Sequence, residues 1–161
     1  MTKPTLDRID RRILKELMRD ATIPVAQLAE RVNLSQTPCW KRVRKLEEAG
    51  FITGRVALVD PQSIGLGLIV FVEIEAADHT PAWREALLRT LEGFPEVVEA
   101  YRLAGDVDYL LKVAVPDMTA FDQFYNSLTA GLPCRNVTSK FAMERIKSTT
   151  AWPIDTERHV L

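Results

Sequence analysis

Four cationic side chains fall within the five positions from Lys41 to Lys45, and Gln36 and Thr37 precede them by about one helical turn. Lysine and arginine neutralise the phosphates of a nucleic acid, whereas glutamine and threonine hydrogen-bond to base edges. An isolated basic run is more often a solvated surface. The cluster therefore indicates a nucleic-acid contact only if the surrounding elements present it on one exposed face.

A second set of candidate residues is the stretch Gly105-Asp106-Val107-Asp108. Backbone N–H groups of a glycine-containing turn can bind an anion, and either carboxylate could accept hydrogen bonds from an ammonium group. A free amino acid carries both charges, and each needs a partner when buried. The same residues are also typical of a plain hairpin turn, so the residues alone leave both interpretations open.

The remaining reactive side chains form no recognisable site. Cys39 and Cys134, like His79 and His159, are too few and too scattered for a metal site. We expect Cys39 in the core and Cys134 in a surface loop, where a structural role is favoured over redox sensing. No Ser/His/Asp set, nucleophile motif or phosphate loop is evident, so we expect neither enzymatic activity nor a metal cofactor.

The charge of the 161-residue chain is divided unevenly. Residues 1–60 contain 12 basic and 8 acidic residues, a net charge of +4, whereas residues 61–161 contain 9 and 14, a net charge of −5. This asymmetry predicts a basic domain over 1–60 and an acidic domain over 61–161. No apolar run is long enough to cross a bilayer, and no charged-then-apolar leader opens the sequence. We therefore expect a cytoplasmic protein with no membrane partner.

The basic half shows helical hydrophobic spacing three times. The predicted helices cover 7–20, 25–32 and 35–49. Ser35 is a suitable N-cap for the third helix and Gly50 a suitable stop. Residues 51–59 are typical of two short strands around a glycine turn. A short helix, a tight turn, a second helix and a hairpin together predict a winged helix-turn-helix.

The third helix would bury Cys39, Val43 and Leu46 and leave its opposite face to solvent. We predict that double-stranded DNA lies on that face, with cations at phosphates and polar side chains at base edges. Trp40 could contact a groove or pack against the end of the helix. The predicted DNA-binding residues are Ser35, Gln36, Thr37, Trp40, Lys41, Arg42, Arg44, Lys45 and Arg55.

The acidic half has the order β-α-β-β-α-β. The predicted strands cover 66–76, 97–103, 108–115 and 137–146, and Thr80 and Asp117 cap the two helices. This order predicts a ferredoxin-like domain and places the chain in the α+β class. The first strand begins apolar on both faces, so we expect a second copy to cover the sheet's open face. The resulting dimer would suit a palindromic operator.

The sequence resembles the Lrp/AsnC family, the feast/famine regulators of bacteria and archaea, over nearly its whole length. The matching stretches are Leu6-Asp7-Arg8-Ile9-Asp10, Ile13-Leu14, Leu28-Ala29, Val32-Asn33-Leu34-Ser35, Thr37-Pro38-Cys39, Arg42-Val43, Leu46-Glu47, Gly50-Phe51-Ile52, Gly65-Leu66, Gly105 to Leu111 and Met143-Glu144. The resemblance implies a transcriptional regulator of amino-acid metabolism associated with the nucleoid. It also implies a ligand-binding RAM (regulation of amino acid metabolism) domain, dimers formed through the sheets, and octamers.

The resemblance further implies that the Gly-Asp-x-Asp turn helps form an effector pocket between dimers. The implied effector-binding residues are Tyr101, Leu103, Gly105, Asp106, Asp108, Thr138 and Ser139. The stretches 38–42, 56–58 and 139–144 are most similar to cysteine-responsive members, while branched-chain amino acids and proline remain open as effectors. The alternative function is an architectural, nucleoid-associated DNA-binding protein with little sequence preference.

Overall fold

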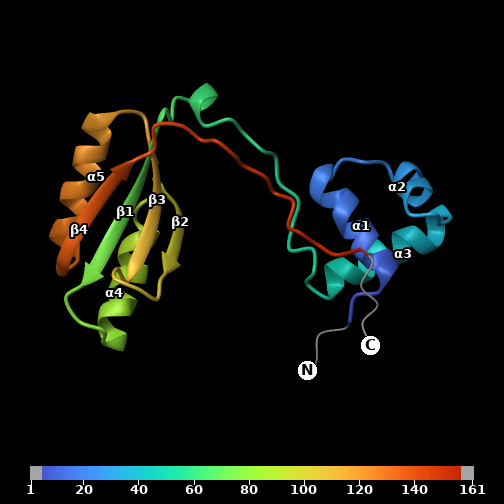
Figure 1. Ribbon diagram of the computed structural model, residues 1–161, viewed down its shortest axis with the longest axis horizontal. Coiled ribbons are helices and arrows are strands. Elements are labelled where there is room, and N and C mark those ends of the chain that lie inside the picture. The colour runs from blue at the N-terminus through green and yellow to red at the C-terminus, as the bar shows by residue number, and fades with distance from the viewer. Residues whose placement is uncertain (1–4, 157–161) are drawn as a thin grey trace. The chain divides into compact units, whose positions relative to one another are not determined.

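The computed structural model describes residues 5–156, which form two compact units (Figure 1). The first unit runs to Ala57 and takes up the chain again from Ile146, and the second runs from Leu58 to Arg145. The division of the sequence at residue 60 placed everything beyond it in the second domain. In the structure the segment from Ile146 onward groups with the first unit.

Three helices build the first unit: α1 (Arg8–Arg19), α2 (Val25–Arg31) and α3 (Gln36–Glu48). Between α2 and α3, Asn33 adopts a positive φ of 57°, a conformation that asparagine tolerates better than most residues and that allows a tight turn. The helices share one apolar core, made of Ile13, Ile23, Leu28, Ala29, Val32, Cys39, Val43 and Leu46. The predicted helix-turn-helix is confirmed.

The two short strands predicted over residues 51–59 are absent. The backbone N–H groups of Phe51 and Ile52 donate to the carbonyl of Leu46, at 2.9 and 3.2 Å, and so close the end of α3. The residues that follow are exposed and extended, without a strand partner among the described residues. A two-stranded hairpin with no third strand and no packed face is marginally stable, which explains the difference.

The described C-terminal segment, residues 146–156, contains no helix or strand and lies against α1. The Thr150 hydroxyl donates to the carbonyl of Met18 at 3.2 Å, and Arg11 Nη1 donates to the carbonyl of Asp155 at 3.5 Å. These contacts account for the grouping of this segment with the first unit.

The second unit is a four-stranded antiparallel sheet in the order β2-β3-β1-β4 with two helices. After a short 3-10 turn (Gln62–Ile64), its elements are β1 (Leu68–Ala76), α4 (Pro81–Glu92), β2 (Val97–Arg102), β3 (Tyr109–Val115), α5 (Met118–Gly131) and β4 (Cys134–Phe141). This order confirms the ferredoxin-like prediction. The predicted extension of the last strand to residue 146 is wrong: β4 ends at Phe141, opposite Val70, and is followed by one hydrogen bond from the Ala142 N–H to the carbonyl of Ile69 at 3.0 Å.

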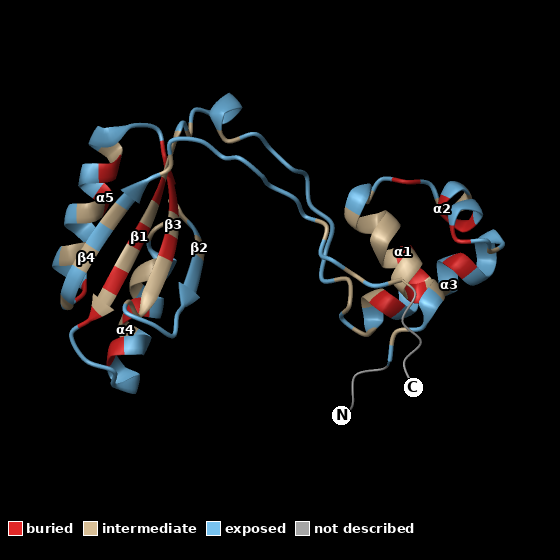
Figure 2. Cartoon of the chain, viewed as in Figure 1, coloured by how far each residue is buried: buried red, intermediate tan, exposed pale blue. Residues whose placement is uncertain are grey.

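Both helices cover one face of the sheet. Along β1, Val70, Val72 and Ile74 are fully buried against apolar side chains of α4 and α5, and the alternate residues are only partly covered (Figure 2). The face without helices carries ion pairs beside its apolar residues: Lys112 to Glu99 and Lys140 to Glu73, each at 2.6 Å. The uncovered face is therefore mixed in polarity.

Candidate nucleic-acid interface and effector site

The N-terminal half of α3 presents a polar surface opposite a buried stripe. Ser35 occupies the N-cap position, although its hydroxyl accepts no capping hydrogen bond. Gln36 and Thr37 are exposed in the first turn, whereas Cys39 is fully buried and burial raises the pKa of its thiol. The helix therefore points its base-reading residue types toward solvent, as the spacing predicted.

The exposed cations on α3 differ in their surroundings. Lys41 and Lys45 are exposed on the helix surface. The Arg44 guanidinium lies 5.7 Å from the ring centroid of Trp40 and 3.9 Å from Glu48. Trp40 is 51% exposed, so it lies on the open face beneath Arg44 and is not packed against the end of the helix.

Arg42 does not point to the open face. Its Nη1 atom donates to Asp7 Oδ2 at 2.6 Å and to Asp10 Oδ1 at 2.7 Å, and both acceptors belong to the start of α1. Hydrogen bonding to Asp7 is the main cause that raises the pKa of Arg42. This guanidinium is held inside the first unit, so it differs from the other cations of the basic run, and its phosphate contact stays a prediction.

Arg55 also departs from its predicted position. It lies in the extended segment after α3 and not on a wing strand, and its Nη2 atom is 2.9 Å from Glu47. About half of its side chain is exposed, so it remains near the end of α3. Of the nine residues predicted to contact DNA, the structure brings Gln36, Thr37, Trp40 and three cations to the exposed surface of α3.

The turn between β2 and β3 holds the predicted effector loop, and its two aspartates differ. Asp108 Oδ2 accepts from the backbone N–H of Ala76 at 2.8 Å, and Oδ1 lies 3.6 Å from His79 Nδ1. The Asp108 backbone also pairs with Leu103 and Ile74. Asp108 therefore holds the loop against the end of β1, and its role as an ammonium acceptor stays a prediction. Asp106 is exposed at the turn beside Gly105.

Tyr101 and Thr138 share a face of the sheet but lie at opposite edges. The register places Tyr101 opposite Leu110, Leu110 opposite Glu73, and Glu73 opposite Thr138. Three strand spacings separate the ends of this row, about 14 Å. One chain therefore cannot close a small pocket around both residues.

Ser139 points to the other face. It lies opposite the buried Val72, and its hydroxyl oxygen is buried without a hydrogen-bond partner among the described residues. Because side chains alternate along a strand, Thr138 and Ser139 cannot line one pocket on the same face. Their roles in effector binding stay predictions, for two different faces of the edge strand β4.

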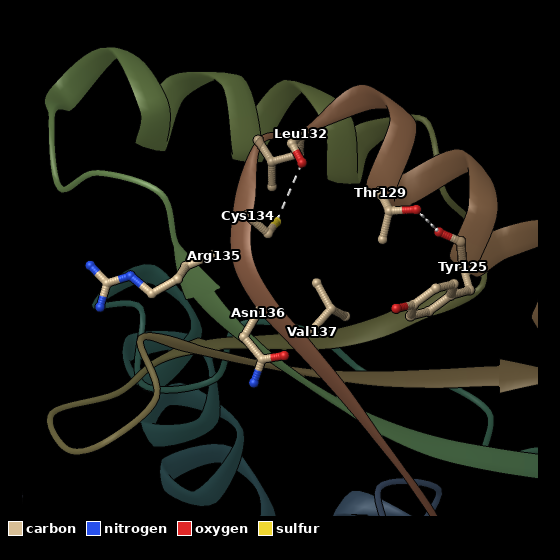
Figure 3. A pocket seen from close by; sticks show the side chains of 7 residues that line it. All are labelled: Tyr125, Thr129, Leu132, Cys134, Arg135, Asn136 and Val137. Atoms are coloured by element: carbon tan, nitrogen blue, oxygen red, sulfur yellow. Dashed lines mark hydrogen bonds between the residues drawn. The ribbon is translucent and has the colours of Figure 1, made fainter.

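A pocket of about 280 Å³ that the sequence did not predict lies between α5 and β4 (Figure 3). Its lining residues are Tyr125, Thr129, Leu132, Cys134, Arg135, Asn136 and Val137. Arg135 is the charged residue of this set, and its side chain points away. The pocket therefore lacks the paired charges that a zwitterionic amino acid requires, and it contains none of the predicted effector residues.

Cys134 begins strand β4 and does not lie in a loop, which corrects its predicted position. Its thiol lies 3.4 Å from the carbonyl of Leu132, and burial raises its pKa. A raised thiol pKa lowers the fraction of reactive thiolate.

Residues 5–156 offer neither a membrane-spanning helix nor a metal-binding cluster. No helix there is long and apolar enough to span a membrane. No group of three metal-binding side chains comes together there either, and His159 lies outside the described residues.

Family models match both units. A winged helix-turn-helix DNA-binding model matches residues 6–53, and the Lrp/AsnC ligand binding domain matches residues 69–152, more than half of the chain. The chain belongs to the Lrp/AsnC family. The resemblance found in the sequence is therefore confirmed, and this Lrp/AsnC protein is a DNA-binding transcriptional regulator with a ligand-binding domain.

Individual relatives extend over nearly the whole Lrp/AsnC chain. The DNA-binding transcriptional activator DecR of Escherichia coli (strain K12) is 47% identical over 93% of this chain and 99% of its own length. The crystal structure of an AsnC family transcriptional regulator from Agrobacterium tumefaciens has a TM-score of 0.88 at 51% identity, covering 92% and 97% of the two chains. The transcriptional regulator NMB0573/L-Met complex from Neisseria meningitidis has the same TM-score and coverage at 35% identity.

Proposed function

We propose that this protein binds a specific double-stranded, palindromic operator through the exposed face of α3, and that an amino acid bound to its second unit controls this binding. The observation that best supports this proposal is that α3 has a buried side and an exposed side. Cys39, Val43 and Leu46 are buried, whereas Gln36, Thr37 and Lys41 face solvent. Residue types suited to base reading and to phosphate neutralisation thus share one surface, which supports the proposal. The activity is regulatory and not enzymatic, and its DNA partner places it at the nucleoid in the cytoplasm.

A duplex selected by the protein from a random pool tests the DNA half of this proposal. Fluorescence anisotropy would compare that duplex with a shuffled duplex of the same length at physiological salt. Specific regulators bind their sites about 10³-fold or more tightly than other DNA, with a steep salt dependence. Equal affinity for both duplexes would instead support an architectural protein with little sequence preference.

The effector half of the proposal rests on charge. Asp106 is an exposed carboxylate beside a glycine-containing turn, which together offer an acceptor for an ammonium group and N–H donors for a carboxylate. Tyr101 and Thr138 lie at opposite edges of the sheet, so a complete pocket requires residues from another copy of the chain. The L-Met complex of the Neisseria relative supports an amino acid as the effector class.

A thermal-shift screen of the twenty amino acids tests the effector. A ligand that binds the folded state raises the melting temperature by mass action, by an amount that grows with its concentration. Cysteine is the first candidate, from the resemblance of three stretches of the sequence. Asp106→Ala should lose the shift while melting normally without ligand. Twenty amino acids without a shift would contradict amino-acid control.

We also propose that the protein self-associates, because a pocket that needs residues from another copy requires an interface between copies. The uncovered sheet face, with Ile69 and Phe71 partly exposed beside two ion pairs, is the surface proposed to meet a second copy. A dimer would supply the two-fold symmetry of a palindrome, and an octamer is the assembly that the family resemblance implies. Sedimentation velocity, with and without the effector found in the screen, measures the assembly directly.

A further inference from the structure

The first turn of α1 and the middle of α3 are joined by one guanidinium. Asp7 and Asp10 form a capping box: the N–H of Asp10 donates to Asp7 Oδ1 at 2.8 Å, and the N–H of Asp7 donates to Asp10 Oδ2 at 3.2 Å. The remaining oxygen of each carboxylate accepts from Arg42 Nη1, at 2.6 and 2.7 Å. Every carboxylate oxygen in this arrangement thus has a donor.

The contact between Arg42 and the two aspartates is partly buried and fixes the orientation of the groups that make it. Asp10 is 7% exposed, and the Arg42 side chain is 32% exposed. Burial acts to raise the pKa of Asp7, but the N–H of Asp10 and the Arg42 guanidinium outweigh it and lower that pKa. The apolar contacts among the helices are non-directional, whereas a guanidinium bound to two carboxylates fixes an orientation.

We propose that Arg42 is a positioning residue for DNA recognition, which acts through the Asp7–Asp10 capping box to hold α3 at the angle that reads base edges. This inference rests on the proposed function, in which α3 is the reading helix. Arg42 precedes the buried Val43 and lies one to two turns after Gln36 and Thr37, so a change in the tilt of α3 would move both polar side chains relative to the bases. Phosphate contact falls to exposed cations such as Lys41 and Lys45.

Asp7→Asn distinguishes a positioning role of Arg42 from a phosphate contact, because the two roles predict opposite changes in DNA affinity. Asparagine retains the N-cap acceptor for Asp10 but removes one of the two carboxylates that pair with Arg42, leaving Asp10 in place. If Arg42 binds a phosphate, weakening its attachment to α1 and removing a negative charge should both strengthen DNA binding. If Arg42 positions α3, the same substitution should weaken binding to the selected duplex.

Glu16→Gln is the matched control. Glu16 is also an ion-paired carboxylate of α1, 2.8 Å from Arg31 of α2, and its loss leaves Arg42 untouched. We expect Asp7→Asn to lower the ratio of affinities for the selected and shuffled duplexes by about fivefold or more, and Glu16→Gln to leave that ratio unchanged. Equal strengthening by both variants on both duplexes would overturn the proposal.

A salt titration provides a second measurement that loss of stability alone would not change. Arg42→Gln should lower the affinity for the selected duplex but retain the wild-type slope of log affinity against log salt, because no phosphate contact is lost. Lys45→Gln should reduce that slope by about one per protomer. A reduced slope in Arg42→Gln would overturn the positioning role. Failure of the wild-type protein to select any duplex would instead count against the proposed function.

Discussion

The predicted DNA contacts of the first unit lie mostly on one helix, whereas the predicted effector residues of the second unit are spread across a sheet. Gln36, Thr37 and Lys41 share the exposed side of α3. Tyr101 and Thr138 lie on opposite edge strands. A helix brings residues three or four positions apart onto one face, so its site is local. A sheet site depends on register and topology and, in the proposed effector pocket, on a second copy of the chain.

The largest effect is expected from a substitution that destabilises the hydrophobic core of one unit and not that of the other. Leu111 is fully buried on β3, and Leu111→Ala should cost about 3 kcal/mol in the second unit through lost burial and a cavity. Leu28→Ala is the matched substitution in the core of the first unit. Each should lower one calorimetric transition and leave the other in place. A single transition that both substitutions lower equally would contradict two independent cores.

The next largest effects are expected from substituting the two aspartates of the β2–β3 turn, one for stability and the other for effector binding. Asp108→Ala removes the acceptor of the Ala76 N–H and should cost about 1–2 kcal/mol of stability. Asp106→Ala should change stability by less than about 0.5 kcal/mol, because the side chain is exposed, but should abolish the amino-acid-induced shift in melting temperature. If Asp108→Ala were instead stable but lost the ligand-induced shift in melting temperature, Asp108 would be the residue that binds the ammonium group.

The difference between the units also explains which features were predictable from the sequence. Thr80 and Asp117 were recognisable as caps, and their side chains accept from Trp83 N at 3.2 Å and Ala120 N at 2.9 Å. Cys39 was recognisable as core from its spacing to Val43. These features depend on a few neighbouring residues, which the sequence displays directly.

Features that depend on distant partners were not predictable. The engagement of Arg42 requires that Asp7, 35 residues earlier, lies beside it, and the composition of the basic run gives no sign of this. The orientation of Ser139 depends on its register with Val72. The hairpin expected after α3 failed because strands need partners, which a local pattern does not supply.

Loss of a single exposed cation should have a smaller effect. Lys41 is exposed on α3, and Lys41→Ala should weaken binding to selected and shuffled duplexes by a similar factor, about tenfold or less, and reduce the salt slope by about one per protomer. Amino-acid affinity measured by calorimetry should be the same in Lys41→Ala and the wild-type protein. A change confined to the selected duplex would make Lys41 a base contact.

The smallest effect expected is a pH dependence that differs between the units. The pKa of Asp7 is lowered in the folded protein, so its pairing stabilises the first unit above the ordinary aspartate range near pH 4 and is lost as the pH falls through the lower folded value. Because Asp7 is half exposed, the contribution should stay below about 1 kcal/mol.

The pKa of Glu99 in the second unit is also lowered, by the hydrogen bond from Lys112, so the same pH dependence is expected there. Melting curves between about pH 3 and 6 should therefore show that Asp7→Asn reduces the acid dependence of the first transition only, and Glu99→Gln that of the second. Unchanged acid dependence in Asp7→Asn would mean that other carboxylates dominate in the first unit.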